Sequence, residues 1–79
     1  MAELEKLLLL LARSLVEEPE AVEVSGTETG SRVDLELRVA QEDMGKIIGR
    51  QGRTIRAIRT VVKAASVKLG KRVSVEVPG

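Results

Sequence analysis

Apolar positions along the chain recur with two periods, one helical and one alternating, and the changes of period mark the predicted elements. Near the N-terminus leucines recur every three or four positions, which predicts an amphipathic helix over Glu3–Val16 that Pro19 ends. Two alternating stretches follow, Ala21–Ser25 and Arg32–Val39, and the segment Gly26–Ser31 between them has the composition of a turn. Together they predict a hairpin with one apolar and one polar face.

Helical spacing returns twice in the second half of the chain. Gln41–Ile48 predicts a short helix that ends at Gly49, and Arg53–Leu69 predicts a long one. Arg72–Val77 alternates again and predicts a third strand. Because each strand has one apolar face, we expect the three helices to cover that face only, in a two-layer α+β domain of order α-β-β-α-α-β. The crossover through two helices lets the last two strands run parallel, so we expect a three-stranded mixed sheet.

The composition limits the function classes open to the chain. Its 79 residues make a single domain over positions 1–79, and the absence of Cys and His excludes disulfides, thiolate nucleophiles and the usual zinc sites. Glu42 and Asp43 are adjacent acids, but neighbours on a helix point in different directions and acids are common in a first turn. We therefore expect no catalytic residues, no metal and no cofactor. The N-terminal apolar run is too short to span a bilayer and Arg13 interrupts it, so we expect a cytoplasmic protein with no membrane partner.

Charge divides the chain into two unlike parts. Residues 1–43 carry eleven acids and four bases, whereas residues 44–79 carry nine bases and one acid, Glu76. Such asymmetry indicates that the C-terminal part meets a polyanion.

A glycine pair, Gly49 and Gly52, lies between the two predicted helices of this basic part. Glycine has no Cβ and reaches positive φ at little cost, so such a loop can bring backbone N–H groups close to a phosphate. The helix that follows offers unpaired N–H groups and a positive dipole end, and Arg50 and Arg53 add full charges. The spacing alone is near chance level, so a plain helix–helix turn and a merely solvated basic face remain alternatives. A P-loop is excluded because no G-K-[ST] follows Gly45.

The segment Ile47–Ile55, I-I-G-R-Q-G-R-T-I, resembles the signature of the K homology (KH) domain, and the element order matches the type II arrangement. The segment Val39–Ala65 is similar to the small bacterial KhpA family of RNA-binding proteins, and the resemblance covers nearly the whole chain. It implies a type II KH fold that clamps about four unpaired nucleotides of single-stranded RNA without catalysis, with the bases in an aliphatic groove and limited base readout. The residues expected at the RNA are Lys46, Ile48, Gly49, Arg50, Gln51, Gly52, Arg53 and Arg56.

A second stripe of small or apolar residues lies on the outer side of the predicted long helix, at Ala57, Thr60, Ala64 and Val67. Alanine is a good helix former, which explains the stripe without any partner. Alternatively, two such helices pack together in a two-fold homodimer. The resemblance favours the dimer and implies a larger KH-containing partner, KhpB. The competing function is accordingly a dimerisation or partner-docking module whose binding of RNA or single-stranded DNA is incidental.

Overall fold

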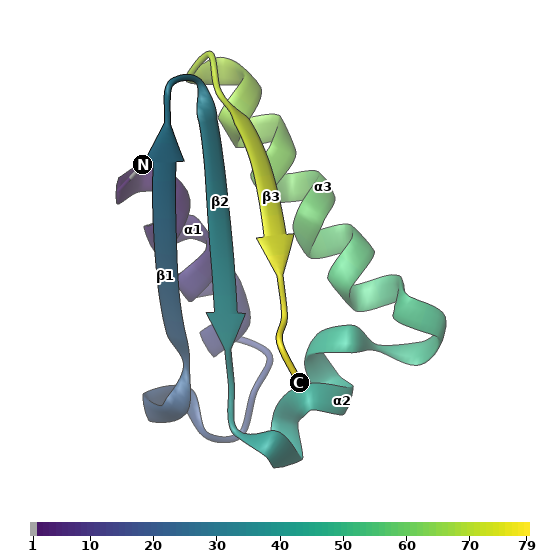
Figure 1. Cartoon of the computed structure of the whole chain (residues 1–79). Coiled ribbons are helices and arrows are strands. Elements are labelled where there is room, and N and C mark those ends of the chain that lie inside the picture. Colours follow the sequence, from purple (N-terminus) through teal and green to yellow (C-terminus); the bar gives the residue numbers. More distant parts are fainter. Residues whose placement is uncertain (1) are drawn as a thin grey trace.

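A three-stranded sheet with helices on one face forms the molecule, as the sequence predicts (Figure 1). The computed structural model describes residues 2–79. The elements are α1 (Ala2–Arg13), β1 (Glu23–Thr29), β2 (Arg32–Arg38), α2 (Met44–Ile48), α3 (Arg53–Lys68) and β3 (Arg72–Glu76), with short 3₁₀ turns at Pro19–Ala21, Gln41–Asp43 and Arg50–Gly52. Figure 1 shows α1 and α3 behind the sheet and α2 beyond the ends of β2 and β3. The architecture is therefore the predicted two-layer α+β sandwich.

The sheet is mixed, with β2 in the centre. β1 pairs antiparallel with β2, and β3 pairs parallel with β2 in the register Val33↔Val73 and Leu35↔Val75. Val33, Leu35 and Leu37 are buried against the helices, as their alternation predicts. Because β3 has a strand neighbour on one side only, its other edge is open.

The core between the layers is aliphatic throughout. α1 and α3 contribute buried residues three or four apart, and β2 contributes buried residues two apart. The buried apolar residues are Leu4, Leu8, Ala12, Val22, Val33, Leu35, Leu37, Ile47, Ile55, Ile58, Val62 and Val75. Complete removal from water stabilises the fold by about 1.5–3 kcal/mol for a side chain of leucine size.

The hairpin differs from its predicted form. The strand predicted over Ala21–Ser25 instead runs through Glu23–Thr29, so most of the segment predicted as a turn belongs to β1. Gly26 pairs with Leu35, and the turn itself is only Gly30 and Ser31, with Gly30 at φ 61°. The glycine and threonine residues of this segment are typical of turns, so the predicted turn was too long. Two residues are enough to join two antiparallel strands.

The helix boundaries also differ from the predicted ones. α1 ends at Arg13 rather than Val16, and Ser14 donates from Oγ to the carbonyl oxygen of Leu11 at 2.7 Å. Leu15 consequently lies outside the helix and is 41% exposed, while Ala12 completes the buried stripe. The helix predicted over Gln41–Ile48 is divided into a 3₁₀ turn followed by α2.

The C-terminal end of α3 shows a similar change. The helix ends at Lys68, and Leu69, which the spacing placed in the core, is 42% exposed. Ser66 is buried in that part of the helix, and its Oγ donates to the carbonyl oxygen of Lys63 at 2.7 Å. The intrahelical bond lets a hydroxyl occupy an apolar site.

Candidate nucleic-acid interface

The loop Gly49–Gly52 joins α2 to α3 with a backbone that favours glycine at both ends. Gly49 lies at φ 75° and ψ 172°, and Gln51 and Gly52 follow at φ 57° and φ 74°. Gly49 is also closely packed, because a Cβ there would lie 2.2 Å from Thr54 Oγ1 and 2.8 Å from the Thr54 backbone nitrogen. A Cβ on Gly52 would meet nothing within 4 Å. Conformation alone therefore favours glycine at Gly52, whereas Gly49 is required by conformation and space together.

Two arginines of α3 hold this loop in place. Arg56 donates from Nε to the carbonyl oxygen of Gly52 at 3.3 Å and from Nη2 to that of Gln51 at 3.1 Å. Arg53 donates from Nη2 to Gln51 Oε1 at 3.3 Å. A guanidinium on the two carbonyl oxygens offsets their negative partial charge, which would otherwise repel an approaching anion.

The start of α3 lies directly behind the loop. No side chain forms a capping hydrogen bond at Gly52, so no side-chain oxygen competes for the first-turn N–H groups. Those groups and the positive end of the helix dipole favour an anion at this position. α3 has 16 residues, which is long enough for a full dipole effect.

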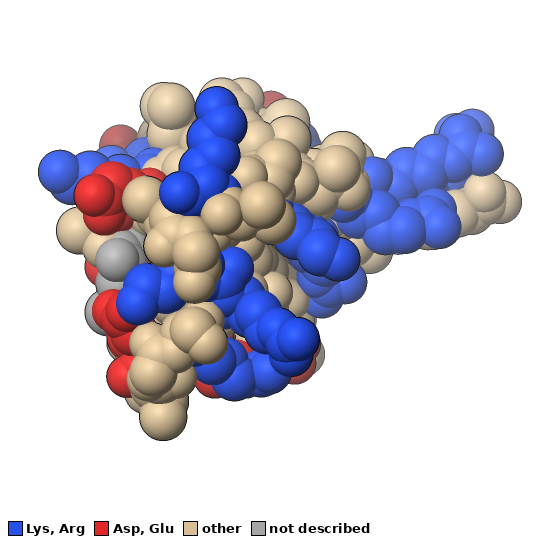
Figure 2. Space-filling view, turned by 90° about the horizontal axis from the view of Figure 1, so that it is seen from above, with Lys and Arg blue, Asp and Glu red and all other residues tan. Residues whose placement is uncertain are grey.

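All eight residues predicted at the RNA lie in or beside this loop. Lys46, Arg50 and Arg53 are exposed, and Lys46 Nζ lies 3.9 Å from a carboxylate oxygen of Glu17. Ile48 is half-buried and packs against the core, beneath the surface rather than on it. Figure 2 shows basic side chains extending from the side of the molecule on which Figure 1 places the loop, while acidic side chains gather mainly on the other side.

A groove lies between α3 and the open edge of β3. One part is a hollow of about 420 Å³ lined by Arg59, Lys63, Val73, Ser74, Val75 and Glu76. A second hollow shares Lys63 and Val73 with it and extends toward Arg72. Arg59 donates from Nε to the carbonyl oxygen of Val75 at 3.1 Å, which ties the helix to the strand edge. Sequence reasoning did not connect Arg59 to β3, because no local pattern shows which strand a helix will face.

Asp43 is the other residue that sequence reasoning missed. Expected to be an ordinary acid of a helix first turn, it is 1% exposed. Its two carboxylate oxygens accept hydrogen bonds from the backbone N–H groups of Glu17 and Glu18, each at 3.1 Å. Asp43 therefore joins the segment after α1 to the start of α2, which leads into the loop. In sequence it looks the same as an exposed capping acid.

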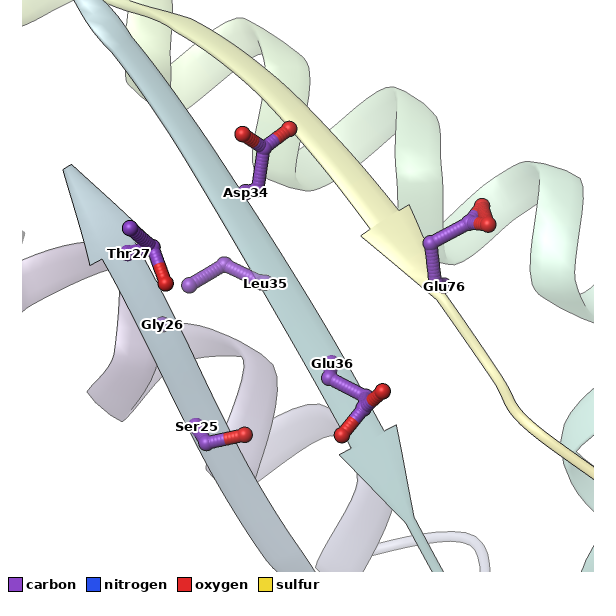
Figure 3. A pocket seen from close by; sticks show the side chains of 7 residues that line it. All are labelled: Ser25, Gly26, Thr27, Asp34, Leu35, Glu36 and Glu76. Carbon is purple, nitrogen blue, oxygen red and sulfur yellow. The ribbon is translucent and has the colours of Figure 1, made fainter. Parts of the chain in front are cut away.

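The uncovered face of the sheet carries charges of both signs, since Arg32 pairs with Asp34 and Arg38 pairs with Glu36. Figure 3 shows the carboxylates of Asp34, Glu36 and Glu76 over this face, and Glu36 lies opposite Glu76 in the parallel pair. Ser74 donates from Oγ to Asp34 Oδ1 at 2.6 Å, and this hydrogen bond lowers the pKa of the Asp34 carboxyl. Among residues 2–79, no group of three or more acids is placed to hold a metal ion. The face therefore lacks the excess of positive charge that surrounds the loop, which favours the loop side for a polyanion.

The stripe predicted as a dimer contact lies on the outside of α3. Ala57, Thr60 and Ala64 are exposed, and Val67 is 68% exposed. Beside the stripe, between α1 and α3, lies a largely apolar hollow that includes Leu15 and the exposed Val61. Within the described part of the chain, no helix has the length and apolar character needed to cross a membrane.

Comparison with known proteins gives consistent relatives. A family model described as the KhpA/KhpB KH domain matches residues 5–77. The chain is 54% identical to the RNA-binding protein KhpA of Clostridium acetobutylicum over 74 residues, which is 94% of this chain and 99% of that protein. It is 50% identical to the RNA-binding protein KhpA of Clostridium perfringens, with the same shares covered. A crystal structure of Aquifex aeolicus Era bound to GDP·AlF4⁻ superposes on 95% of this chain with a TM-score of 0.68 and 20% identity, and the chain spans 29% of that protein. At that identity the likeness shows the fold alone.

Proposed function

The chain belongs to the KhpA/KhpB KH-domain family, and from this premise we propose that it is a non-catalytic protein that holds single-stranded RNA at the Gly49–Gly52 loop. The observation that carries the proposal is the loop itself. The backbone of the loop depends on glycine and leads into the first turn of α3, where no side chain forms a capping hydrogen bond. Exposed arginines lie beside it. The relatives' names support RNA as the ligand class, and the loop geometry supports this position for it.

In this proposal the phosphate backbone lies against the loop. Gly49 and Gly52 let the chain approach closely, Arg50 and Gln51 form the tip, and Arg53 contributes charge at the start of α3. Each contact between a basic side chain and a phosphate releases condensed counterions, so affinity depends on salt.

Lys46 and Arg56 act at the two flanks. Lys46 adds positive charge on the α2 side, and Arg56 supports the carbonyl side of the loop. The bases then lie in the groove between α3 and β3, where the half-buried Val73 supplies aliphatic surface. Ile48 serves this groove from below as part of the packed layer. A location in the cytoplasm belongs to the same proposal.

The test is a titration of fluorescently labelled single-stranded RNA at several salt concentrations. The logarithm of affinity should fall with the logarithm of salt, with a slope of roughly −0.7 for each phosphate contacted. Changing Arg50 and Gln51 together to Asp should abolish binding and leave thermal unfolding nearly unchanged, because both side chains are exposed. Arg13→Asp, an exposed basic residue at the end of α1, is the control for loss of positive charge elsewhere. RNA affinity equal before and after the loop substitutions would refute the RNA function.

We propose further that the outer face of α3 associates with a second copy. Ala57 and Ala64 allow close approach of two helices, and the exposed Val61 and Val67 supply apolar surface that water disfavours. A larger KH-containing protein such as KhpB would compete for the same face. Ala64→Arg should convert the dimer to a monomer in analytical ultracentrifugation, while Thr27→Arg on the open sheet face should not. A wild type that sediments as a monomer at high concentration would exclude the homodimer.

The alternative of a docking module with incidental nucleic-acid binding makes a different prediction. The Arg50 and Gln51 substitutions would then leave partner association and cellular function intact. A parallel titration with single-stranded DNA of the same sequence measures how far the loop distinguishes RNA from DNA.

A further inference from the structure

One side of the Arg59 guanidinium group is held by a hydrogen bond, and its other side has no partner among the described residues. Its Nε donates to the Val75 carbonyl oxygen at 3.1 Å, on the open edge of β3. Its terminal nitrogens, Nη1 and Nη2, make no hydrogen bond or ion pair with any residue from 2 to 79. The guanidinium is planar and rigid, so holding Nε also orients the terminal pair of N–H donors. This orientation is set before any ligand arrives.

The groove around Arg59 is lined by two cationic side chains, one hydroxyl and one carboxylate. Lys63, one helical turn further along α3, adds an ammonium group to the same hollow. The Ser74 hydroxyl is already bonded to Asp34, and Glu76 lies at the exposed end of β3. Val73, which is half-buried, gives the hollow aliphatic surface against which a base can lie. Among the side chains that line this hollow, Arg59 is the one whose two terminal donors are held in a fixed orientation, so we assign the selection among bases to it.

We propose that Arg59 gives this groove a preference for guanine, and this inference rests on the proposed RNA function. Guanine presents two adjacent acceptors, O6 and N7, which match the two terminal nitrogens of an arginine. Adenine presents N7 beside an N6 amino group, so one donor would face another donor. The loop holds the phosphate backbone of any sequence, and Arg59 adds the base-dependent part of the affinity.

The test compares four octamers by fluorescence anisotropy: an all-uridine RNA and the same RNA with a single guanine, adenine or cytosine near the centre. The guanine octamer should bind the wild type roughly five- to tenfold more tightly than the others, at the lower end of what a bidentate arginine–guanine contact discriminates. Replacing guanine with 7-deazaguanine, which has C–H where N7 was, should remove most of that preference. Arg59→Lys keeps the charge but has no fork, so its preference should fall below about twofold.

The control separates base readout from a purely structural role. Arg59→Lys also breaks the bond to Val75, and a merely structural effect would weaken all four octamers by the same factor. Arg13→Lys, a conservative change remote from the groove, should retain the guanine preference. A circular-dichroism melt of each variant reports the fold.

Several results would overturn the inference. They are equal binding of all four octamers by the wild type, a preference for adenine or cytosine, or an unchanged guanine preference in Arg59→Lys. Equal binding of all sequences, with affinity lost in the Arg50 and Gln51 variant, would leave the proposed RNA function intact. Absence of binding to every octamer would refute both.

Discussion

Substituting each loop glycine with alanine gives a sharp test of the loop geometry, because the two sites differ in space but share a positive φ. Gly49 at φ 75° and ψ 172° occupies a region that is essentially restricted to glycine. An alanine Cβ there would also lie 2.6 Å from Thr54 Cβ and 2.8 Å from the Thr54 nitrogen. Gly52 at φ 74° and ψ 18° is left-handed helical, and a Cβ would meet nothing within 4 Å.

The expected costs follow from these differences. The backbone strain at Gly49 costs about 1–3 kcal/mol, and forcing a methyl group against α3 costs about another 1–3 kcal/mol. At Gly52 only the left-handed penalty of about 1–2 kcal/mol applies, and a less flexible unfolded chain offsets about 0.4–1 kcal/mol of it. A domain of this size has a free energy of unfolding of about 4–12 kcal/mol. Gly49→Ala therefore removes a large share of the stability, and Gly52→Ala removes little.

Urea denaturation and thermal melts measure both variants. Each 1 kcal/mol lowers the Tm of a domain this small by about 4–8 °C. The net cost of about 0–1.6 kcal/mol at Gly52 then gives a fall of at most about 13 °C, and we expect the Tm of Gly49→Ala to fall further than that of Gly52→Ala, by about 8 °C or more. Adding Thr54→Ala to Gly49→Ala removes the clash with Oγ1 but leaves the backbone nitrogen in place, so it should recover less than half of the loss. If Gly49→Ala were no less stable than Gly52→Ala, the packing argument would be wrong.

Three further predictions concern the supports of the site. Asp43→Asn should destabilise the fold by about 1–3 kcal/mol in urea denaturation, because an amide cannot accept at both oxygen positions; a change under about 0.5 kcal/mol would contradict this. The Ser74 hydrogen bond lowers the pKa of Asp34, so the stability that this bond adds to the fold is complete above the usual pKa of 3.8 and is lost as the pH falls below it. Ser74→Ala should raise the pKa of Asp34 in an NMR titration, and the fold should lose less stability at acid pH. Arg56→Lys should weaken RNA binding roughly three- to tenfold with an unchanged salt slope, since lysine keeps the charge but cannot hold two carbonyl oxygens. NMR relaxation at Gln51 should show a more mobile loop in this variant. Unchanged relaxation and affinity would refute the proposal that Arg56 supports the loop.

The sequence predicted the elements better than their ends. Alternation placed Val33, Leu35 and Leu37 in the core, since period two in a strand leaves no other face for them. It misplaced the hairpin turn, because Gly26 and Thr27 favour a turn only when no partner strand is available to pair with them. Tertiary pairing overrode the local preference in this segment.

The candidate site shows the same division. The glycine spacing and the basic residues around it stand in the sequence, so local pattern is enough to expect Arg50 and Arg53 at an anion site. The structure adds a supporting role for Arg56, whose two hydrogen bonds run to carbonyl oxygens of the loop. That assignment requires knowing where the loop carbonyls point, which no side-chain pattern reports.

By itself, the sequence determined the layers of the fold, the excess of positive charge in the C-terminal part and the position of the loop. These properties depend on local period, charge and glycine content, which are fixed residue by residue. Only the tertiary structure decided that Asp43 is buried against the segment after α1 and that Arg59 meets the edge of β3. Both contacts join residues at least 16 positions apart. Such contacts form because packing the helices on the sheet brings those atoms together, and the chain encodes that packing as a whole rather than in any one stretch.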